Sequence, residues 1–135
     1  MRIVLDTNVL VAGLLSPHGP CATIVRMVSS GELTLCLDAR IVSEYREVLR
    51  RPKFGFDEDR VAALLEQLEH QGEITAAGPL ATRLPDSDDE MFLEIAVSAR
   101  SQVLVTGNLV HFPPHLREGM EVLSPAEFVA FCRGL

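Results

Sequence analysis

The sequence predicts an α/β protein in which a parallel sheet carries helices on both faces. Short apolar runs such as Ile3-Val4-Leu5 alternate along the chain with segments whose apolar residues recur at helical spacing. This alternation is typical of parallel strands joined by helical crossovers. The chain has 135 residues, of which 47% are hydrophobic and 5% aromatic, so we expect one domain, 1–135, with an aliphatic core.

In the first half of the chain, the apolar runs predict strands at 2–6 and 33–37. Helical spacing predicts a helix at 9–15, broken by the Ser-Pro-His-Gly-Pro segment that follows it, and a second helix from Cys21 to Gly31. Asp38 is a suitable N-cap for a third helix, which we expect to run to Arg51 and to end at Pro52.

In the second half, an amphipathic helix is expected at 57–71 and a short strand at 73–77, followed by a loop at 78–85. Ser87 and Glu90 have the spacing of a capping box at the start of the next helix, which predicts that Glu90 folds back onto the cap. Strands follow at 102–105 and 121–123. Ser124 and Glu127 then open the last helix with the same spacing.

The cysteines, the histidines and the N-terminal segment do not indicate a functional site. The three cysteines stand in apolar sequence, which favours buried thiols over a disulfide or zinc framework; they are Cys21, Cys36 and Cys132. His111 and His115 have a helical metal-ligand spacing, but two prolines between them forbid that helix, and we assign the pair no role. No apolar stretch is long enough for a signal peptide or a membrane span, so we expect a cytoplasmic protein.

The formal net charge of −7 argues at first against a nucleic-acid partner. The distribution of charge matters more than its sum, because a local basic run lies near the end of the third helix. Its four residues could contact phosphates, or could simply form a solvated helix face; they are Arg46, Arg50, Arg51 and Lys53.

Three carboxylates occupy positions that a purely structural residue would not favour. Asp6 follows a buried strand, at the sheet edge where ligands of parallel sheets bind. Glu44 lies on the apolar stripe of its helix, where an ion pair with Arg40 is the structural alternative. Asp89 shares a helix face with apolar residues, so its charge must be neutralised, paired or bound to a cation.

Neighbouring acids are accounted for by local structure. Asp88 faces the positive end of a helix dipole, and Glu94 is expected to face solvent. If Asp6, Glu44 and Asp89 converge, they repel one another unless a cation neutralises them. A site made of oxygen ligands suits Mg²⁺ or Mn²⁺ better than zinc or copper, and such sites are used to hydrolyse phosphodiesters.

Four motifs follow one another along the chain: VLDTNVLV at 4–11, SEYREVL at 43–49 with RPKF at 51–54, DSDDEMFLEIA at 86–96 and LVTGN at 104–108. In this ordered series the chain resembles the PIN domain family, and most closely its VapC-like ribonuclease toxins from bacterial toxin–antitoxin systems. The resemblance implies a three-layer α/β/α sandwich and Mg²⁺- or Mn²⁺-dependent cleavage of RNA. It also implies a cognate antitoxin protein as partner and a homodimer.

The family's functional residues can be carried over by position. Asp6, Glu44 and Asp89 match the three metal ligands. Asp86 matches an acid common in this branch of the family, which either supports the ligands from behind or binds a second metal. The match also covers three polar residues that orient ligands or water, Thr7, Asn8 and Thr106. One position departs from the pattern, because Asn108 stands where many relatives have a fourth aspartate. Its amide oxygen can bind a cation but brings no charge, which leaves the second metal open.

Other classes fit less well. A receiver domain needs a lysine after a late strand, whereas the only lysine here is Lys53, in a loop after a helix. A haloacid-dehalogenase-type phosphatase needs a second aspartate two residues after the first, where this chain has Asn8. The remaining alternative is a catalytically weak or inactive PIN-like module whose acidic pocket binds RNA or a basic partner peptide.

Overall fold

A five-stranded parallel sheet forms the centre of the protein. The computed structural model describes residues 1–134, so Leu135, the last residue of the expected domain, lies outside the described residues. The strands are β1 (Arg2–Leu5), β2 (Thr34–Leu37), β3 (Glu73–Ile74), β4 (Val103–Val105) and β5 (Val122–Leu123). Their order across the sheet is β3-β2-β1-β4-β5, and all four pairings are parallel.

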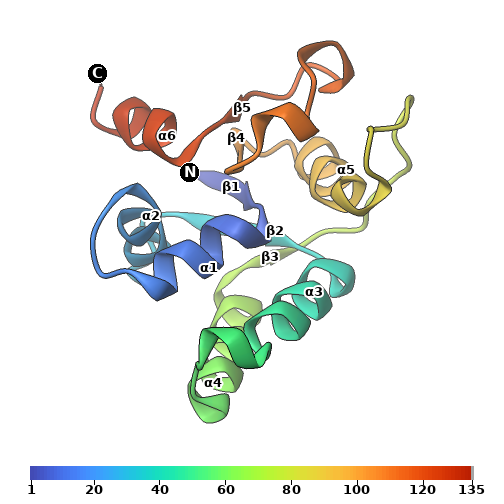
Figure 1. The fold of residues 1–135 in the computed structure, drawn as a ribbon. Helices are drawn as coiled ribbons and strands as arrows, with labels where there is room; N and C mark the ends of the chain where they lie inside the picture. Colours follow the sequence, from blue (N-terminus) through green and yellow to red (C-terminus); the bar gives the residue numbers. More distant parts are fainter. Residues whose placement is uncertain (135) are drawn as a thin grey trace.

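Helices cover both faces of this sheet. They are α1 (Thr7–Leu15), α2 (Pro20–Ser29), α3 (Ala39–Leu49), α4 (Glu58–Gln71), α5 (Glu90–Ala99) and α6 (Pro125–Cys132). Helix α5 packs against β1, β2 and β4 and lies beside α3, whereas α2 and α6 pack together on the other side (Figure 1). The expected three-layer α/β/α sandwich is therefore confirmed.

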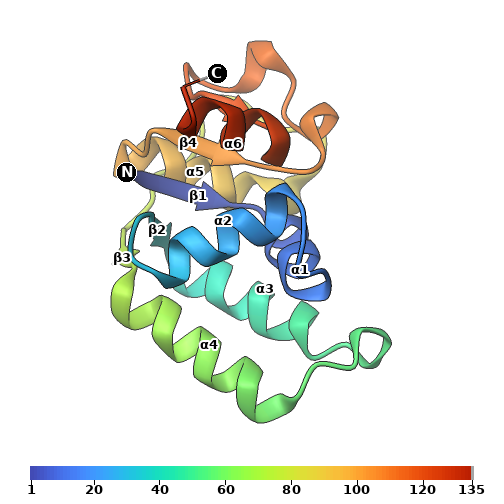
Figure 2. The ribbon, with the colours of Figure 1, turned by 90° about the vertical axis from the view of Figure 1, so that its left-hand side faces the viewer.

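The register of the sheet brings β1 and β4 to the same edge. Leu5 pairs with Val105, so the residues that follow the two strands, Asp6 and Thr106, are neighbours. Figure 2 shows β1 running toward α1, which begins directly after Asp6. The central strands are almost completely buried, which holds this edge in place.

The structure corrects one expected helix start and one expected strand, and it confirms two helix caps. Helix α1 starts at Thr7 rather than at residue 9, because Asp6 already takes the N-cap position. The third expected strand is shorter and contains only Glu73–Ile74. Asp38 caps α3 as expected, and Ser124 with Glu127 forms the expected capping box of α6.

The capping box expected at Ser87 and Glu90 is wrong. Residues Ser87–Asp89 form a 3-10 turn, and the side chain that caps it is Asp86, which accepts a hydrogen bond of 2.9 Å from the Asp88 N–H. Glu90 instead accepts hydrogen bonds from the Leu84 N–H at 2.9 Å and from the Arg83 guanidinium at 3.0 Å. The carboxylate of Glu90 therefore holds the loop before the helix rather than the helix end.

Two further expectations on side chains are only partly met. All three cysteines are free, but only Cys36 is buried, since Cys21 and Cys132 are partly exposed. Glu94 does not face solvent freely, because it forms an ion pair of 2.8 Å with Arg40.

Within residues 1–134, no single helix is long and apolar enough to span a membrane. Helices α1 and α2 have the required length and apolar content only when taken together, as a pair bent by 98°.

Candidate active site

Asp6 is fixed at the end of β1 by its neighbours on β4. Its backbone N–H donates to the Val105 carbonyl at 2.9 Å, which continues the sheet by one residue. One carboxylate oxygen, Oδ2, accepts a hydrogen bond of 2.8 Å from the buried hydroxyl of Thr106. Asn8 Nδ2 lies 3.5 Å from the same oxygen and donates a weak hydrogen bond to it. The carboxylate is thus held by neutral donors.

Glu44 reaches the same edge from α3. The hydroxyl of Thr7 donates a hydrogen bond to Glu44 Oε2. The next residue, Tyr45, is completely buried and donates its hydroxyl proton to the Leu5 carbonyl, which anchors α3 to the end of β1. Arg40 pairs with Asp38 and Glu94, so the ion pair that was the structural alternative for Glu44 is not formed.

Asp89 lies at the start of α5 and is 91% buried, since only 9% of its surface is exposed. Its Oδ2 atom has no hydrogen-bond donor among the described residues. His111 Nδ1 lies 3.1 Å from this oxygen, but the contact lacks hydrogen-bond geometry. A buried carboxylate oxygen without a donor costs free energy in the folded protein unless something else binds it.

These side chains surround one open cleft of about 540 Å³. It is lined by Asp6 at the end of β1 and by residues from α1, α3, the turn after α3, the start of α5 and the segment after β4. Its polar members are Asp6, Thr7, Asn8, Glu44, Arg51, Asp89, Asn108 and His111. Three carboxylates that are 38 to 83 residues apart in the sequence therefore share a single cavity. Thr106 lies directly behind Asp6 and is completely buried.

Other expected site residues lie outside this cleft or at its rim. Asp86 is exposed, and one of its oxygens is used for the cap of the turn. Of the four basic residues, only Arg51 lines the cleft, and it pairs with Glu47 at 2.9 Å. Arg46 lies 3.6 Å from Glu69, Lys53 lies over the ring of Phe54, and Arg50 is exposed at the end of α3.

All three cleft carboxylates bind protons more tightly than usual. Burial raises the pKa of Asp6, although the Thr106 hydrogen bond partly offsets this. Burial also raises the pKa of Glu44, against the opposing effect of the Thr7 hydroxyl. The pKa of Asp89 is raised to about 6, chiefly by burial and then by the charge of Asp6. The cleft therefore resists the accumulation of negative charge unless a cation enters it.

The donor set fits a divalent cation. Asp89 has a buried oxygen without a donor, and two further carboxylates and two amides line the same cavity. Oxygen ligands of this kind suit Mg²⁺ and Mn²⁺, which bind through one or two carboxylates and keep several waters. Within the described residues, no three His, Cys, Asp or Glu side chains are already gathered closely enough to hold a metal ion. The side chains would therefore have to move closer together when an ion binds.

His111 is a cleft residue that the helical metal-ligand pattern does not reveal. The two prolines do exclude a helix with His115, but residues Leu109–His111 form a 3-10 turn that brings His111 to Asp89. A better signal is its position, because His111 stands only three residues after Asn108, in the segment that leaves the carboxyl end of β4.

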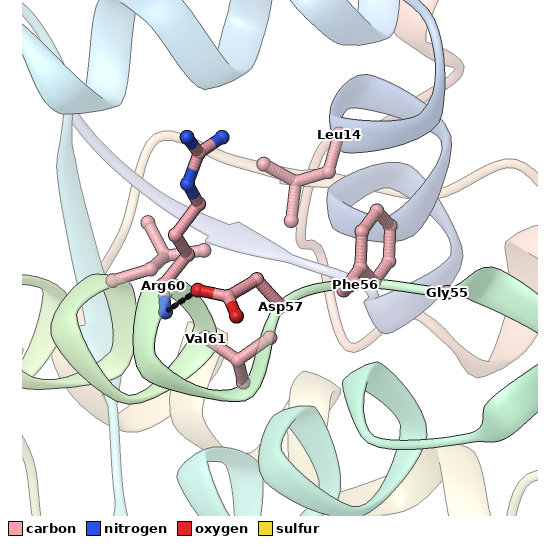
Figure 3. Close-up of a pocket in the computed structure, with 7 residues that line it drawn as sticks. Leu14, Gly55, Phe56, Asp57, Arg60 and Val61 are labelled. Atoms are coloured by element: carbon pink, nitrogen blue, oxygen red, sulfur yellow. Dashed lines mark hydrogen bonds between the residues drawn. The ribbon is translucent and has the colours of Figure 1, made fainter.

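A second cavity, of about 430 Å³, lies between the end of α1 and the start of α4. Figure 3 shows Leu14 and Phe56 on one side and Val61 on the other, with the carboxylate of Asp57 bonded to the backbone N–H of Arg60 at 3.2 Å. Because its lining is mostly apolar and its only carboxylate already caps α4, this cavity lacks the converging polar groups of an active site.

The fold and the cleft define an α/β protein with an acidic site at the carboxyl edge of a parallel sheet. The family description "PIN domain" matches residues 2–110, so the chain belongs to the PIN domain family. PIN domains are generally nucleases and typically use divalent metal ions. The comparison with curated proteins gave no match.

Solved structures show the same fold. FitAcB from Neisseria gonorrhoeae is 17% identical with a TM-score of 0.63, and the alignment covers 93% of this chain and 99% of that one. FitAB bound to an IR36 DNA fragment is 16% identical, with a TM-score of 0.63 and coverage of 93% and 95%. VapBC2 from Rickettsia felis, bound to a DNA fragment from its promoter, is 13% identical, with a TM-score of 0.58 and coverage of 92% and 98%.

Proposed function

We propose that this protein is a metal-dependent endoribonuclease, with Mg²⁺ or Mn²⁺ as cofactor, and the VapC-like toxin of a toxin–antitoxin pair. The observation that carries the proposal is the meeting of Asp6, Glu44 and Asp89 at one cleft, with a buried oxygen of Asp89 lacking a donor. These three carboxylates would hold the metal. When bound, the ion supplies positive charge against the phosphate oxygens and lowers the pKa of water.

The chain's own residues have distinct parts in this proposal. Thr106 and Thr7 each donate a hydroxyl hydrogen bond to a proposed ligand, Asp6 and Glu44 respectively, and so fix the orientation of its carboxylate. The side-chain oxygen of Asn8 accepts a hydrogen bond of 3.1 Å from the Gly107 N–H, which ties α1 to the loop after β4. Asp86, beside Asp89, adds negative charge that favours cation binding.

The substrate and partners are inferred on separate grounds. Arg51 lies at the cleft wall, and Arg46, Arg50 and Lys53 lie on the same helix end and turn, where they would contact RNA phosphates. FitAB and VapBC2 are toxin–antitoxin complexes bound to DNA, which supports an antitoxin as partner of this chain. We further propose that the chain, 1–135, is a single nuclease domain that forms a homodimer in the cytoplasm.

An RNA cleavage assay tests the activity. The purified protein is expected to cleave RNA with Mg²⁺ or Mn²⁺ and to stop when EDTA is added, and Asp89→Asn should abolish cleavage while the fold is kept. Asp59→Asn is the matched control, since Asp59 is an exposed acid on α4 and its loss should leave cleavage unchanged. Cleavage that persists in Asp89→Asn would refute the assignment.

One observation favours a second candidate, a weak or inactive module that binds RNA or a basic peptide. Asn108 lines the cleft at the position where the family pattern has a fourth acid. The site therefore has one negative charge fewer than a PIN domain with that acid. This candidate predicts RNA or peptide binding that does not depend on metal, and no cleavage with any divalent ion. The same assay, read together with binding in EDTA, separates the two.

A further inference from the structure

The contact between Asp89 and His111 has an unusual combination of properties. Nδ1 of His111 lies 3.1 Å from Oδ2 of Asp89, yet this oxygen accepts no hydrogen bond among the described residues. The contact therefore falls short of hydrogen-bond geometry, and no donor among the described residues satisfies the buried oxygen. Two neighbouring ligands of one octahedral ion, each about 2.1 Å from the metal, are separated by about 3.0 Å. The observed separation matches that value.

We propose that His111 Nδ1 and Asp89 Oδ2 bind the same divalent ion, and that this nitrogen ligand makes the site favour Mn²⁺ over Mg²⁺. The inference rests on the proposed metal site and adds to it a ligand of a different chemical class. Imidazole binds first-row transition ions well, whereas Mg²⁺ strongly prefers oxygen. A site made only of carboxylates would not discriminate between the two ions in this way.

The local structure holds the imidazole in place without using it elsewhere. The backbone N–H of His111 donates a hydrogen bond of 3.0 Å to the Asn108 carbonyl, which closes the 3-10 turn. The next residue, Phe112, is completely buried, and its carbonyl accepts a hydrogen bond of 2.7 Å from Arg117 Nε. The His111 side chain itself is 43% exposed, so an ion and its waters can reach it from the cleft.

Two competing roles for His111 are compatible with the same contact. In the first, the imidazole occupies the position that the metal takes and leaves when the ion binds. In the second, it contacts only the phosphate of the substrate and never the metal. Both roles differ from the proposed one in their effect on metal affinity in the absence of RNA, which makes metal binding to the free protein the deciding measurement.

The experiment is isothermal titration of Mn²⁺ and of Mg²⁺ into the full chain, with electron spin echo envelope modulation of the bound Mn²⁺. We expect Mn²⁺ to bind at least about tenfold more tightly than Mg²⁺, with a directly coordinated ¹⁴N signal. His111→Ala should remove that signal and lower the Mn²⁺ affinity by about tenfold or more, with less than about a threefold effect on Mg²⁺. His115→Ala, a nearby exposed histidine, is the control and should change neither.

The outcomes separate this inference from the proposed function. If the wild-type chain binds neither ion, or if Asp89→Asn binds both as well as wild type, the proposed metal site fails. If both ions bind at Asp89 without a ¹⁴N signal, and His111→Ala changes nothing, only the inference is overturned. It is also overturned if His111→Ala binds both ions more tightly, because His111 would then compete with the metal.

Discussion

Replacing Asp89 with asparagine should make the metal-free protein more stable while abolishing its activity. The substitution keeps the shape of the side chain and removes a charge that is buried beside Asp6, with no lysine or arginine paired to it among residues 1–134. In most proteins a polar substitution at a buried position is destabilising. Here the wild-type residue is itself unfavourable, because its carboxylate is ionised at neutral pH in a cleft that opposes negative charge.

The size and pH range of the effect follow from the pKa. Asp89 has a pKa of about 6 in the folded protein and 3.8 as the reference value for the unfolded chain, a difference equivalent to about 3 kcal/mol. The folded state holds the proton of Asp89 more tightly than the unfolded state. The wild-type free energy of unfolding therefore falls as pH rises from about 4 to about 6, and above about pH 6 it stays at this lower value. Water reaches the open cleft and screens the charge, so we expect a measured gain of about 1–2 kcal/mol.

Thermal unfolding in EDTA at pH 7.5 and pH 4 measures this gain. At pH 7.5 the variant should melt about 3–8 °C above wild type, and at pH 4, where the wild-type carboxyl is mostly protonated, the difference should largely disappear. Added Mn²⁺ should stabilise wild type and leave the variant unchanged. The reasoning is refuted if Asp89→Asn in EDTA at pH 7.5 is less stable than wild type, or if its advantage is equal at both pH values.

Three other substitutions test the hydrogen bond that supports the site and the helix caps. Thr106→Val keeps the side-chain shape but leaves Asp6 Oδ2 without its 2.8 Å donor. The variant should therefore lose about 1–3 kcal/mol of unfolding free energy in urea denaturation and cleave RNA more slowly. Unchanged stability would mean that the hydroxyl does not hold the carboxylate. Ser124→Ala should lower the free energy of unfolding by about 1 kcal/mol, because it removes a capping box that is formed. Ser87→Ala should change it by less than about 0.5 kcal/mol, because Ser87 caps no helix. Equal losses in the two variants would mean that Ser87 is a helix cap after all.

Local sequence patterns were sufficient where the position of a residue depends on its own helix or strand. Helical counting placed Asp89 on a core-facing side, and it is buried, although it lies at the end of a 3-10 turn rather than inside the helix. The position of Asp6 follows from a buried strand followed by a polar residue. Likewise, Glu44 stands on the apolar stripe of α3 and reaches the cleft beside Tyr45.

Local patterns failed where the partner comes from a distant segment. Glu94 pairs with Arg40, 54 residues away, and no helical spacing reveals that contact. Glu90 bonds to a loop residue, Leu84, because the loop before α5 folds back over the start of the helix. His111 reaches Asp89 through a 3-10 turn, a geometry for which the sequence carries no periodic signal.

In the part of the chain that the structure describes, the arginines near the cleft leave its three carboxylates without a paired cationic side chain. Nearby guanidinium groups are paired with other acids: Arg40 with Asp38 and Glu94, Arg83 with Glu90, and Arg51 with Glu47. Among the described residues, no arginine or lysine forms an ion pair with Asp6, Glu44 or Asp89, and hydroxyl groups hold the first two. Hydroxyls fix the direction of a carboxylate without cancelling its charge. In the proposed metal site, one divalent ion would offset two of these three negative charges, and so reduce the repulsion between a protein with a net charge of −7 and a polyanion.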